Sequence, residues 1–231
     1  MLIGRENEKN LLRRAFRADR SRFIAVYGRR RVGKTVLIRE TFDYSCTFEH
    51  TGLAKGKYRD QLIAFAASLT DAGASDVMPP QNWMEAFRQL KKIISESHDQ
   101  RKVIFIDELS WMDTKDSGLI SALESVWNGW VTARKEKDII LIVCASATYW
   151  MIDNIVNSKG RLHNRLTAQI HLKPFSLREC EEYLQSRKII FTRYQILQCY
   201  MIMGGFPYLG WRFAPWIKYC QTILMFDNLY Y

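Results

Sequence analysis

Five short apolar runs along the chain predict buried β-strands, at residues 22–27, 46–51, 102–107, 138–145 and 167–172. Continuous runs of this length are typical of strands covered on both faces of a sheet. Between them, apolar residues recur every three or four positions and predict helices at 6–18, 33–42, 58–72, 82–97 and 118–134. Strands that alternate with long helices predict an α/β fold, with three layers and a mostly parallel five-stranded sheet.

The alternation of strands and helices ends near residues 174–176, where a helical segment follows. Two capping boxes predict where its helices begin: Ser176 with Glu179, and Thr192 with Gln195. Residues 194–211 carry no charge and predict a buried helix, followed by a turn at the Gly204-Gly205 pair. We therefore expect a sheet domain over residues 1–175 and a small helical C-terminal module, acting as a lid, over 176–231.

The loop after the first strand carries the most specific signal, a match to G-x-x-x-x-G-K-[ST] between a strand and a helix. Glycines let the backbone approach a ligand, and the N–H groups of such a loop and of the following helix bind phosphate. Lys34 is expected to reach the β- and γ-phosphates, and the Thr35 hydroxyl to ligate Mg²⁺. The candidate nucleotide-binding residues are Gly28, Arg29, Arg30, Arg31, Val32, Gly33, Lys34, Thr35 and Val36. The alternative is a strand-to-helix turn without a ligand.

Arg29, Arg30 and Arg31 occupy the variable positions of this loop. Because the backbone does the phosphate binding, most of these side chains are expected to point away, toward solvent or an acidic neighbour.

A second part of the site is predicted at the strand 102–107, which ends in Asp107 and is followed by Glu108. Asp107 is expected to hold Mg²⁺, directly or through water. Glu108 is placed to activate a water that attacks the γ-phosphate. Carboxyl ends of parallel strands share one edge of a sheet, so both motifs are expected to meet there. Alone, the acidic pair could instead end a strand and cap the next turn.

A carboxylate directly after the metal-binding Asp, together with room for an inserted strand, resembles the additional-strand, catalytic-glutamate branch of P-loop ATPases. That resemblance implies a polar residue at the end of the next strand, in contact with the γ-phosphate or the attacking water. Ser146 is the candidate and Thr148 the reserve. Alternatively, Ser146 caps the helix that begins at Ala147. The chain has no Asn-Lys-x-Asp run, so adenine is favoured over guanine.

Several segments resemble STAND-type, AAA+-related ATPases of the archaeal ATPase family in its prokaryotic members. They are LIGRENE, GRRRVGKT, FIDELSWM, KGRLHNRLTAQIHLKPFSLRE and GGFPYL, and they cover the chain from Leu2 to about Leu209. The resemblance implies that Arg5 and the Gly205-x-Pro207 turn lie by the adenine. It also implies a positive charge near the γ-phosphate from Arg165, with Arg161 the weaker choice. Alternatively, Arg5 pairs with Glu8 or Glu6, and Pro207 only ends a helix.

The prokaryotic relatives usually continue into a winged-helix module and an effector domain. Here residues 211–231 are dense in aromatic side chains. Such a segment is expected to bury against a protein partner or a second copy of the chain. The alternative is that it packs on its own domain. Our hypothesis is that the chain is the ATPase part of a longer protein, or a truncated version of such a protein.

The formal net charge is +10, and residues 1–60 hold 15 lysines and arginines against 7 acidic residues, a local net charge of +8. This balance fits phosphorylated ligands, nucleic acid or an anionic surface, and equally a solvated basic face. Five dispersed cysteines indicate reduced thiols, and the four histidines lack metal-ligand spacing. With no signal peptide and no membrane-spanning run at the sequence level, we expect a cytoplasmic chain.

Three functions share this predicted pocket. The first is a Mg²⁺-dependent ATPase that binds ATP and ADP. The second is a nucleotide-gated switch or scaffold with slow or no hydrolysis. The third is an ATPase associated with DNA through its basic N-terminal quarter.

Overall fold

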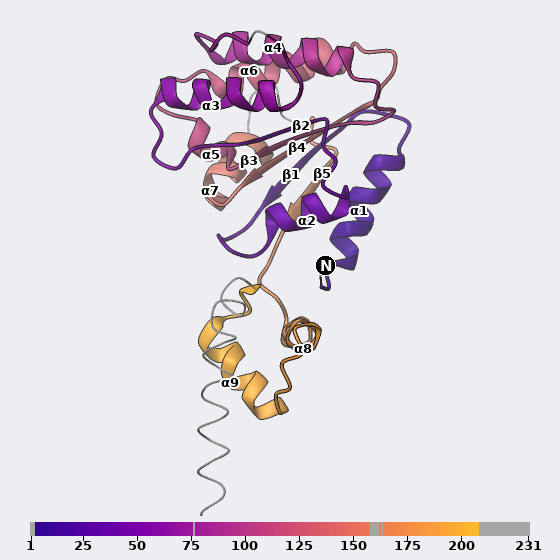
Figure 1. Cartoon of the computed structure of the whole chain (residues 1–231), viewed down its shortest axis with the longest axis vertical. Helices are drawn as coiled ribbons and strands as arrows, with labels where there is room; N and C mark the ends of the chain where they lie inside the picture. The colour runs from indigo at the N-terminus through magenta and orange to yellow at the C-terminus, as the bar shows by residue number, and fades with distance from the viewer. Residues whose placement is uncertain (1–2, 76, 158–161, 163, 208–231) are drawn as a thin grey trace, which may run out of the picture.

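The computed structural model describes residues 3–75, 77–157, 162 and 164–207. Five parallel strands form one sheet in the order β2-β3-β4-β1-β5 (Figure 1). The strands are β1 (Arg22–Tyr27), β2 (Phe48–Thr51), β3 (Lys102–Asp107), β4 (Ile139–Ala145) and β5 (Ala168–His171). The predicted α/β class and the five predicted strands are confirmed, with bounds that differ by two residues at most.

Helices cover both faces of the sheet (Figure 1). Buried side chains of α3 (Tyr58–Asp71), α4 (Trp83–Glu96) and α6 (Leu119–Ser125) pack on one face. Those of α1 (Glu6–Arg17) and α2 (Lys34–Thr41) pack on the other. Along β1, Phe23, Ala25 and Tyr27 join the first core, and Ile24 and Val26 join the second. The uninterrupted apolar run of β1 therefore results from burial on both faces.

The strand order sets the geometry of the site. β4 lies between β1 and β3, and it pairs with both in parallel register. Tyr27 at the end of β1 is level with Ala145 at the end of β4. The segments that follow these strands, and the acidic pair that ends β3, consequently emerge at one edge of the sheet.

The predicted helix 118–134 is two helices, which corrects that expectation. α6 ends at Ser125, and a π-helix, η1 (Val126–Val131), continues the chain. Its wider turn is seen where Thr132 N donates to Trp127 O over 3.1 Å, a bond across five residues. The turn keeps Trp127 in the core, with its ring centroid 5.0 Å from that of Phe23. Two short helices, α5 (Leu109–Met112) and α7 (Thr148–Met151), follow β3 and β4, and a second π-helix, η2 (Ile152–Val156), continues α7.

Beyond the carboxyl edge of the sheet lie α8 (Leu177–Ser186) and α9 (Arg193–Met203), joined to β5 by one connecting segment (Figure 1). Both predicted capping boxes form, at Ser176 and at Thr192. Phe175 N donates to Gly205 O over 2.7 Å. A Cβ on Gly205, whose φ is +72°, would lie 2.3 Å from Phe175 O, so only glycine fits this contact. The division of the chain at residue 175 stays a prediction.

The predicted helix in the uncharged run 194–211 is present as α9, and a turn follows at the glycine pair as predicted. The expectation that this helix is buried is wrong for the described part, because its apolar side chains are largely in solvent. Met201 is 76% exposed and Ile202 85%, whereas Ile196 packs in a small core with Leu184 and Ile189. Two short helices offer too little surface to bury every apolar side chain. The aromatic run 211–231 lies outside the described residues.

Within the described part of the chain, no helix has both the length and the apolar character needed to cross a membrane.

Candidate functional site

The loop between β1 and α2 is shaped by two glycines. Gly28 has φ +150°, and a Cβ on it would lie 2.2 Å from Leu172 O in the segment after β5. Gly33 has φ +94° and forms the N-cap of α2. Because neither position suits a side chain, the loop turns tightly and directs the N-terminal N–H groups of α2 toward its own concave side.

Lys34 is the first residue of α2, and its side chain reaches back into this loop. Its Nζ donates to Gly28 O over 2.9 Å and to Arg29 O over 3.2 Å, and the residue is 6% exposed. These carbonyl contacts hold the ammonium group at the centre of the loop. A ligand cradled by the loop would therefore meet one fixed positive charge as well as backbone N–H groups.

Thr35 and Asp107 connect the loop to β3. The Thr35 hydroxyl donates to Asp107 Oδ2 over 2.5 Å, and Asp107 is 3% exposed. Burial raises the pKa of the Asp107 carboxyl, while the bond from Thr35 opposes that rise. A hydroxyl beside a carboxylate is an oxygen donor set that suits Mg²⁺ with water completing its shell. The described residues contain no cluster of three or more His, Cys, Asp or Glu side chains able to hold a metal ion.

Glu108 and Ser146 connect β3 to β4. Glu108 Oε2 accepts bonds from the Ser146 hydroxyl over 2.6 Å and from Ser146 N over 3.2 Å. Glu108 has φ +49°, a left-handed conformation that turns the chain out of β3. The alternative that Ser146 caps the next helix is wrong, because the N-cap of α7 is Ala147 and no side chain caps it. The hydroxyl orients the Glu108 carboxylate instead.

Lys34, Thr35, Glu108 and Ser146 border a pocket of about 950 Å³ between the edge of the sheet and the helical module. Its cationic lining residues are Arg5, Arg29, Arg30, Arg31, Lys34 and Arg187, and its one acidic lining residue is Glu108. Val32, Gly33, Thr35, Val36, Ser146 and Pro207 also line it. So strong an excess of positive charge around a pocket of this size fits a small polyanion.

The end of the pocket nearest the helical module is apolar and aromatic. Its lining includes Ile3, Phe175, Tyr183, Phe206 and Pro207. The sequence singled out Pro207 alone among these. Ile3, Phe175 and Phe206 lie in segments quoted for the family resemblance, but no role was predicted for them or for Tyr183, because only the fold brings these side chains to one pocket. Flat aromatic surfaces next to a cationic region suit a ligand with a planar ring and a charged tail.

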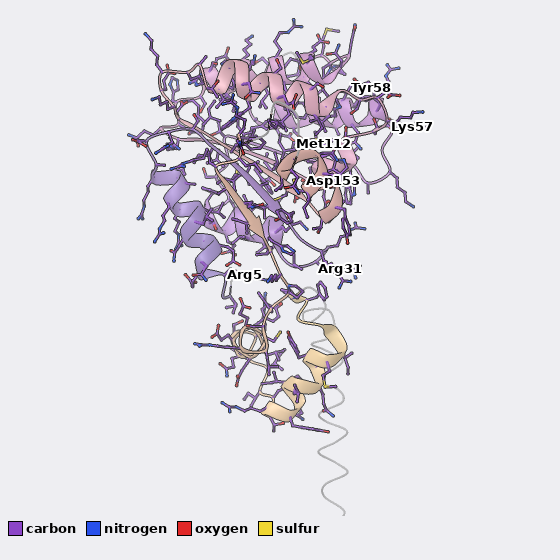
Figure 2. The ribbon with its side chains drawn as sticks, turned by 180° about the vertical axis from the view of Figure 1, so that it is seen from behind. Arg5, Arg31, Lys57, Tyr58, Met112 and Asp153 are labelled. Atoms are coloured by element: carbon purple, nitrogen blue, oxygen red, sulfur yellow. The ribbon has the colours of Figure 1, made fainter. Side chains whose placement is uncertain are left out.

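Arg5 is positioned at this end by three contacts. Its Nη2 donates to Lys173 O over 2.5 Å, its guanidinium lies 4.8 Å from the Phe175 ring centroid, and Nη1 is 3.9 Å from Glu8. Burial lowers the pKa of the Arg5 guanidinium, against the effect of the nearby carboxylates. The predicted pairing with Glu8 is present, and Arg5 lines the pocket as well. Figure 2 labels Arg5 and Arg31 at the edge that faces the helical module.

The loop arginines are exposed, as expected, but two of them contact aromatic rings rather than acidic neighbours. The Arg29 guanidinium lies 5.2 Å from the Phe206 ring centroid, and that of Arg30 lies 5.0 Å from the Trp111 ring centroid. The Arg29 contact joins the phosphate loop directly to the helical module.

Three predicted site residues do not line the pocket: Gly28 and Asp107, which lie directly beside it, and Arg165, which the structure does not bring to it. The Arg165 side chain is exposed, and it is absent from the lining residues. Its N donates to Leu162 O over 2.9 Å, in the turn before β5. Thr148, the reserve for Ser146, begins α7 and does not line the pocket either. Arg161 lies outside the described residues.

The chain is similar to known proteins in sequence and in fold. A curated relative, the uncharacterized protein MJECL04 of Methanocaldococcus jannaschii, is 23% identical over 208 residues, which are 90% of this chain and 43% of that protein. The chain thus spans less than half of the relative's length.

Two solved structures share the fold. The Walker-type ATPase PABY2304 of Pyrococcus abyssi superposes with a TM-score of 0.65 at 15% identity, over 89% of this chain and 65% of that one. The ORC2 protein of Aeropyrum pernix, in its ADPNP–ADP complexes, superposes with a TM-score of 0.58 at 15% identity, over 84% of this chain and 55% of that one.

A family model described as an ATPase domain predominantly from Archaea matches residues 2–209, nearly the whole chain. The match includes the phosphate loop, the acidic end of β3 and the Gly205-x-Pro207 turn. The resemblance seen in the sequence motifs is thereby confirmed, and the chain belongs to this family of archaeal-type P-loop ATPase domains.

Proposed function

We propose that the chain binds Mg²⁺·ATP in this pocket and hydrolyses it to ADP and phosphate, with water activated by Glu108. One observation carries the proposal. Glu108, Lys34 and Thr35 line the same pocket, and the Thr35 hydroxyl is bonded to Asp107 directly behind it. A phosphate-binding loop, a metal-binding pair and a general base are the three parts that phosphoryl transfer to water requires.

Each part has a defined task in this proposal. The loop N–H groups and Lys34 bind the β- and γ-phosphates, while Thr35 and Asp107 hold Mg²⁺. The bound ion neutralises charge on the phosphate oxygens. Arg5, Pro207 and the aromatic end of the pocket receive the adenine. Glu108 accepts the proton of the attacking water, and Ser146 keeps the carboxylate turned toward it.

The exposure of Arg165 supports a role in trans for this residue. A guanidinium in solvent on one copy is free to approach the γ-phosphate held by a neighbouring copy. A residue that acts in trans requires a second chain beside the pocket, so self-association or partnership with another protein is part of the proposal.

Calorimetry and phosphate release test the proposed function. The chain is titrated with ATP in Mg²⁺, with ATP in EDTA, and with GTP, and phosphate release is followed over many turnovers. We expect saturable heat with Mg²⁺·ATP, weaker binding in EDTA and for GTP, and sustained release of phosphate only with Mg²⁺. A folded chain that gives no heat with Mg²⁺·ATP would contradict the site itself.

The same experiment separates the ATPase from a nucleotide-gated switch. Tight retention of ATP or ADP with almost no phosphate release would select the switch. For either function, the Arg29–Phe206 contact offers a route by which the nucleotide state of the phosphate loop can reach the helical module, because it joins the two.

A second candidate function, association with DNA, is favoured by the solvent face of α1. Arg13, Arg14 and Arg17 are exposed on neighbouring positions of this helix. Among the described residues, none of the three pairs with a carboxylate. Their position near the C-terminal end of α1 stabilises the helix, but it leaves three guanidinium groups available to phosphates of a nucleic-acid backbone.

Replacing Arg13, Arg14 and Arg17 together by Ala tests this candidate. We expect about tenfold weaker binding of duplex DNA at low salt and a smaller salt dependence, because each lost phosphate contact releases about one counterion fewer. The control replaces Arg88, Lys91 and Lys92 of α4, on the other face of the sheet, and removes the same charge. Equal DNA binding by both triple variants, in fluorescence anisotropy over a salt series, would exclude α1 as the surface.

A further inference from the structure

A fully buried polar side chain lies outside the pocket and has no task in the reaction described above. Gln61 is one of the buried residues of α3, and its exposed fraction is 0%. Burying an amide costs stability unless its polar atoms find hydrogen-bond partners. The partners of Gln61 therefore indicate which parts of the fold this residue holds in place.

Gln61 bonds to two segments that are far apart in the sequence. Its Oε1 accepts from Leu53 N over 2.9 Å, and its Nε2 donates to Leu53 O over 2.7 Å. Nε2 also donates to Trp111 O over 3.0 Å. One side-chain amide thus joins the loop after β2 to α5, the short helix that lies next to α3 in Figure 1.

Both of these segments contact the backbone of Glu108. Trp111 N donates to Glu108 O over 2.9 Å, in the turn that begins α5. In the loop after β2, Gly52 N donates to Asp107 O over 3.0 Å, and a Cβ on Gly52 would lie 2.7 Å from Glu108 O. The left-handed φ of Glu108 is uncommon for a residue with a side chain, so it needs support from its surroundings. Contacts from α5 and from the loop after β2 give the Glu108 backbone this support.

From these contacts we propose that Gln61, with the loop it holds, is a positioning residue for ATP hydrolysis. It fixes Leu53 and Trp111, and through their segments it keeps the Glu108 carboxylate where it meets the attacking water. This role rests on the proposed function and deepens it, since Gln61 does not line the pocket and acts through Glu108. A small displacement of a general base lowers the reaction rate steeply, whereas phosphate binding by the Lys34 loop does not depend on that base.

Gln61→Met tests this role, because methionine has a similar length but cannot donate to either carbonyl. We expect kcat for ATP hydrolysis to fall about tenfold and the Kd for Mg²⁺·ATP to stay within about twofold of the parent value. Gln89→Met is the matched control and should behave as the parent. Gln89 lies on α4, and its Nε2 donates to Met78 O over 3.1 Å, so it holds a loop in the same way without contacting α5.

The same substitution in the Glu108→Gln background distinguishes positioning from a general loss of stability. If Gln61 acts through the Glu108 carboxylate, adding Gln61→Met should change the slow residual hydrolysis of Glu108→Gln by less than about twofold. An equal loss of rate in both backgrounds would overturn the inference. A folded Gln61→Met variant with parental kcat, or with much weaker ATP binding, would overturn it as well.

Gly52→Ala reaches the same backbone from the loop side and leaves the buried amide in place. Its added Cβ would press on Glu108 O, so we expect the same separation of lower kcat from retained ATP binding. If thermal unfolding shows that Gln61→Met does not fold, parental kcat in folded Gly52→Ala would overturn the inference. These results leave the proposed function intact, since the parent still hydrolyses ATP. A parent chain that binds Mg²⁺·ATP but releases no phosphate would overturn the proposed hydrolysis and this role together.

Discussion

Glu108→Gln is expected to lower the rate of ATP hydrolysis by about a hundredfold or more and to leave ATP affinity within about twofold of the parent. Glutamine has the shape of glutamate, and its amide oxygen can still accept a bond from the Ser146 hydroxyl. It cannot accept the proton of the attacking water. Because the proposed role of Glu108 is confined to the reaction step, binding and turnover should separate in this variant.

The measurement pairs phosphate release with calorimetry on the same preparation. Glu96→Gln, at the exposed end of α4, is the matched control and should behave as the parent in both. If Glu108→Gln releases phosphate at the parental rate, another group activates the water. If it loses affinity as well, the carboxylate contributes to binding and the proposed division of tasks is wrong.

Lys34→Ala is expected to weaken Mg²⁺·ATP binding by about a hundredfold. The substitution removes the one ammonium held inside the loop by Gly28 O and Arg29 O. A hydrogen bond to a charged group contributes about 1.5–3 kcal/mol, and an ammonium shared by two phosphates makes more than one. Loss of the bonds within the loop also leaves its backbone less well ordered for phosphate.

Two controls show whether a loss of binding comes from the site itself. Lys92→Ala, at an exposed site on α4, removes the same charge far from the pocket and should bind ATP like the parent. Thermal unfolding of Lys34→Ala distinguishes weak binding from an unfolded chain, because the residue is buried. A folded Lys34→Ala variant with parental affinity for ATP would show that the nucleotide binds elsewhere.

The order of apolar and polar residues along the chain was sufficient to predict the five strands, their parallel arrangement and both capping boxes. A strand buried on both faces is apolar along most of its length. β1, β3 and β4 can therefore be recognised from the sequence, whichever strands they pair with in the sheet. The phosphate loop could likewise be predicted from local residues, since its glycines and Lys34 act through the backbone of a single turn.

Contacts between distant segments were decided only in three dimensions. Ser146 bonds to Glu108 because β4 is inserted beside β3, and this insertion is a property of strand order rather than of either segment. Arg165 stays in solvent, and the apolar side of α9 remains largely uncovered, because burial depends on which surfaces meet. Local pattern thus determined the elements and the loop. Packing of the N-terminal segment and the helical module around the sheet edge brought Arg5, Phe175 and Arg187 to one pocket, since side chains so far apart in the chain are related only by the fold.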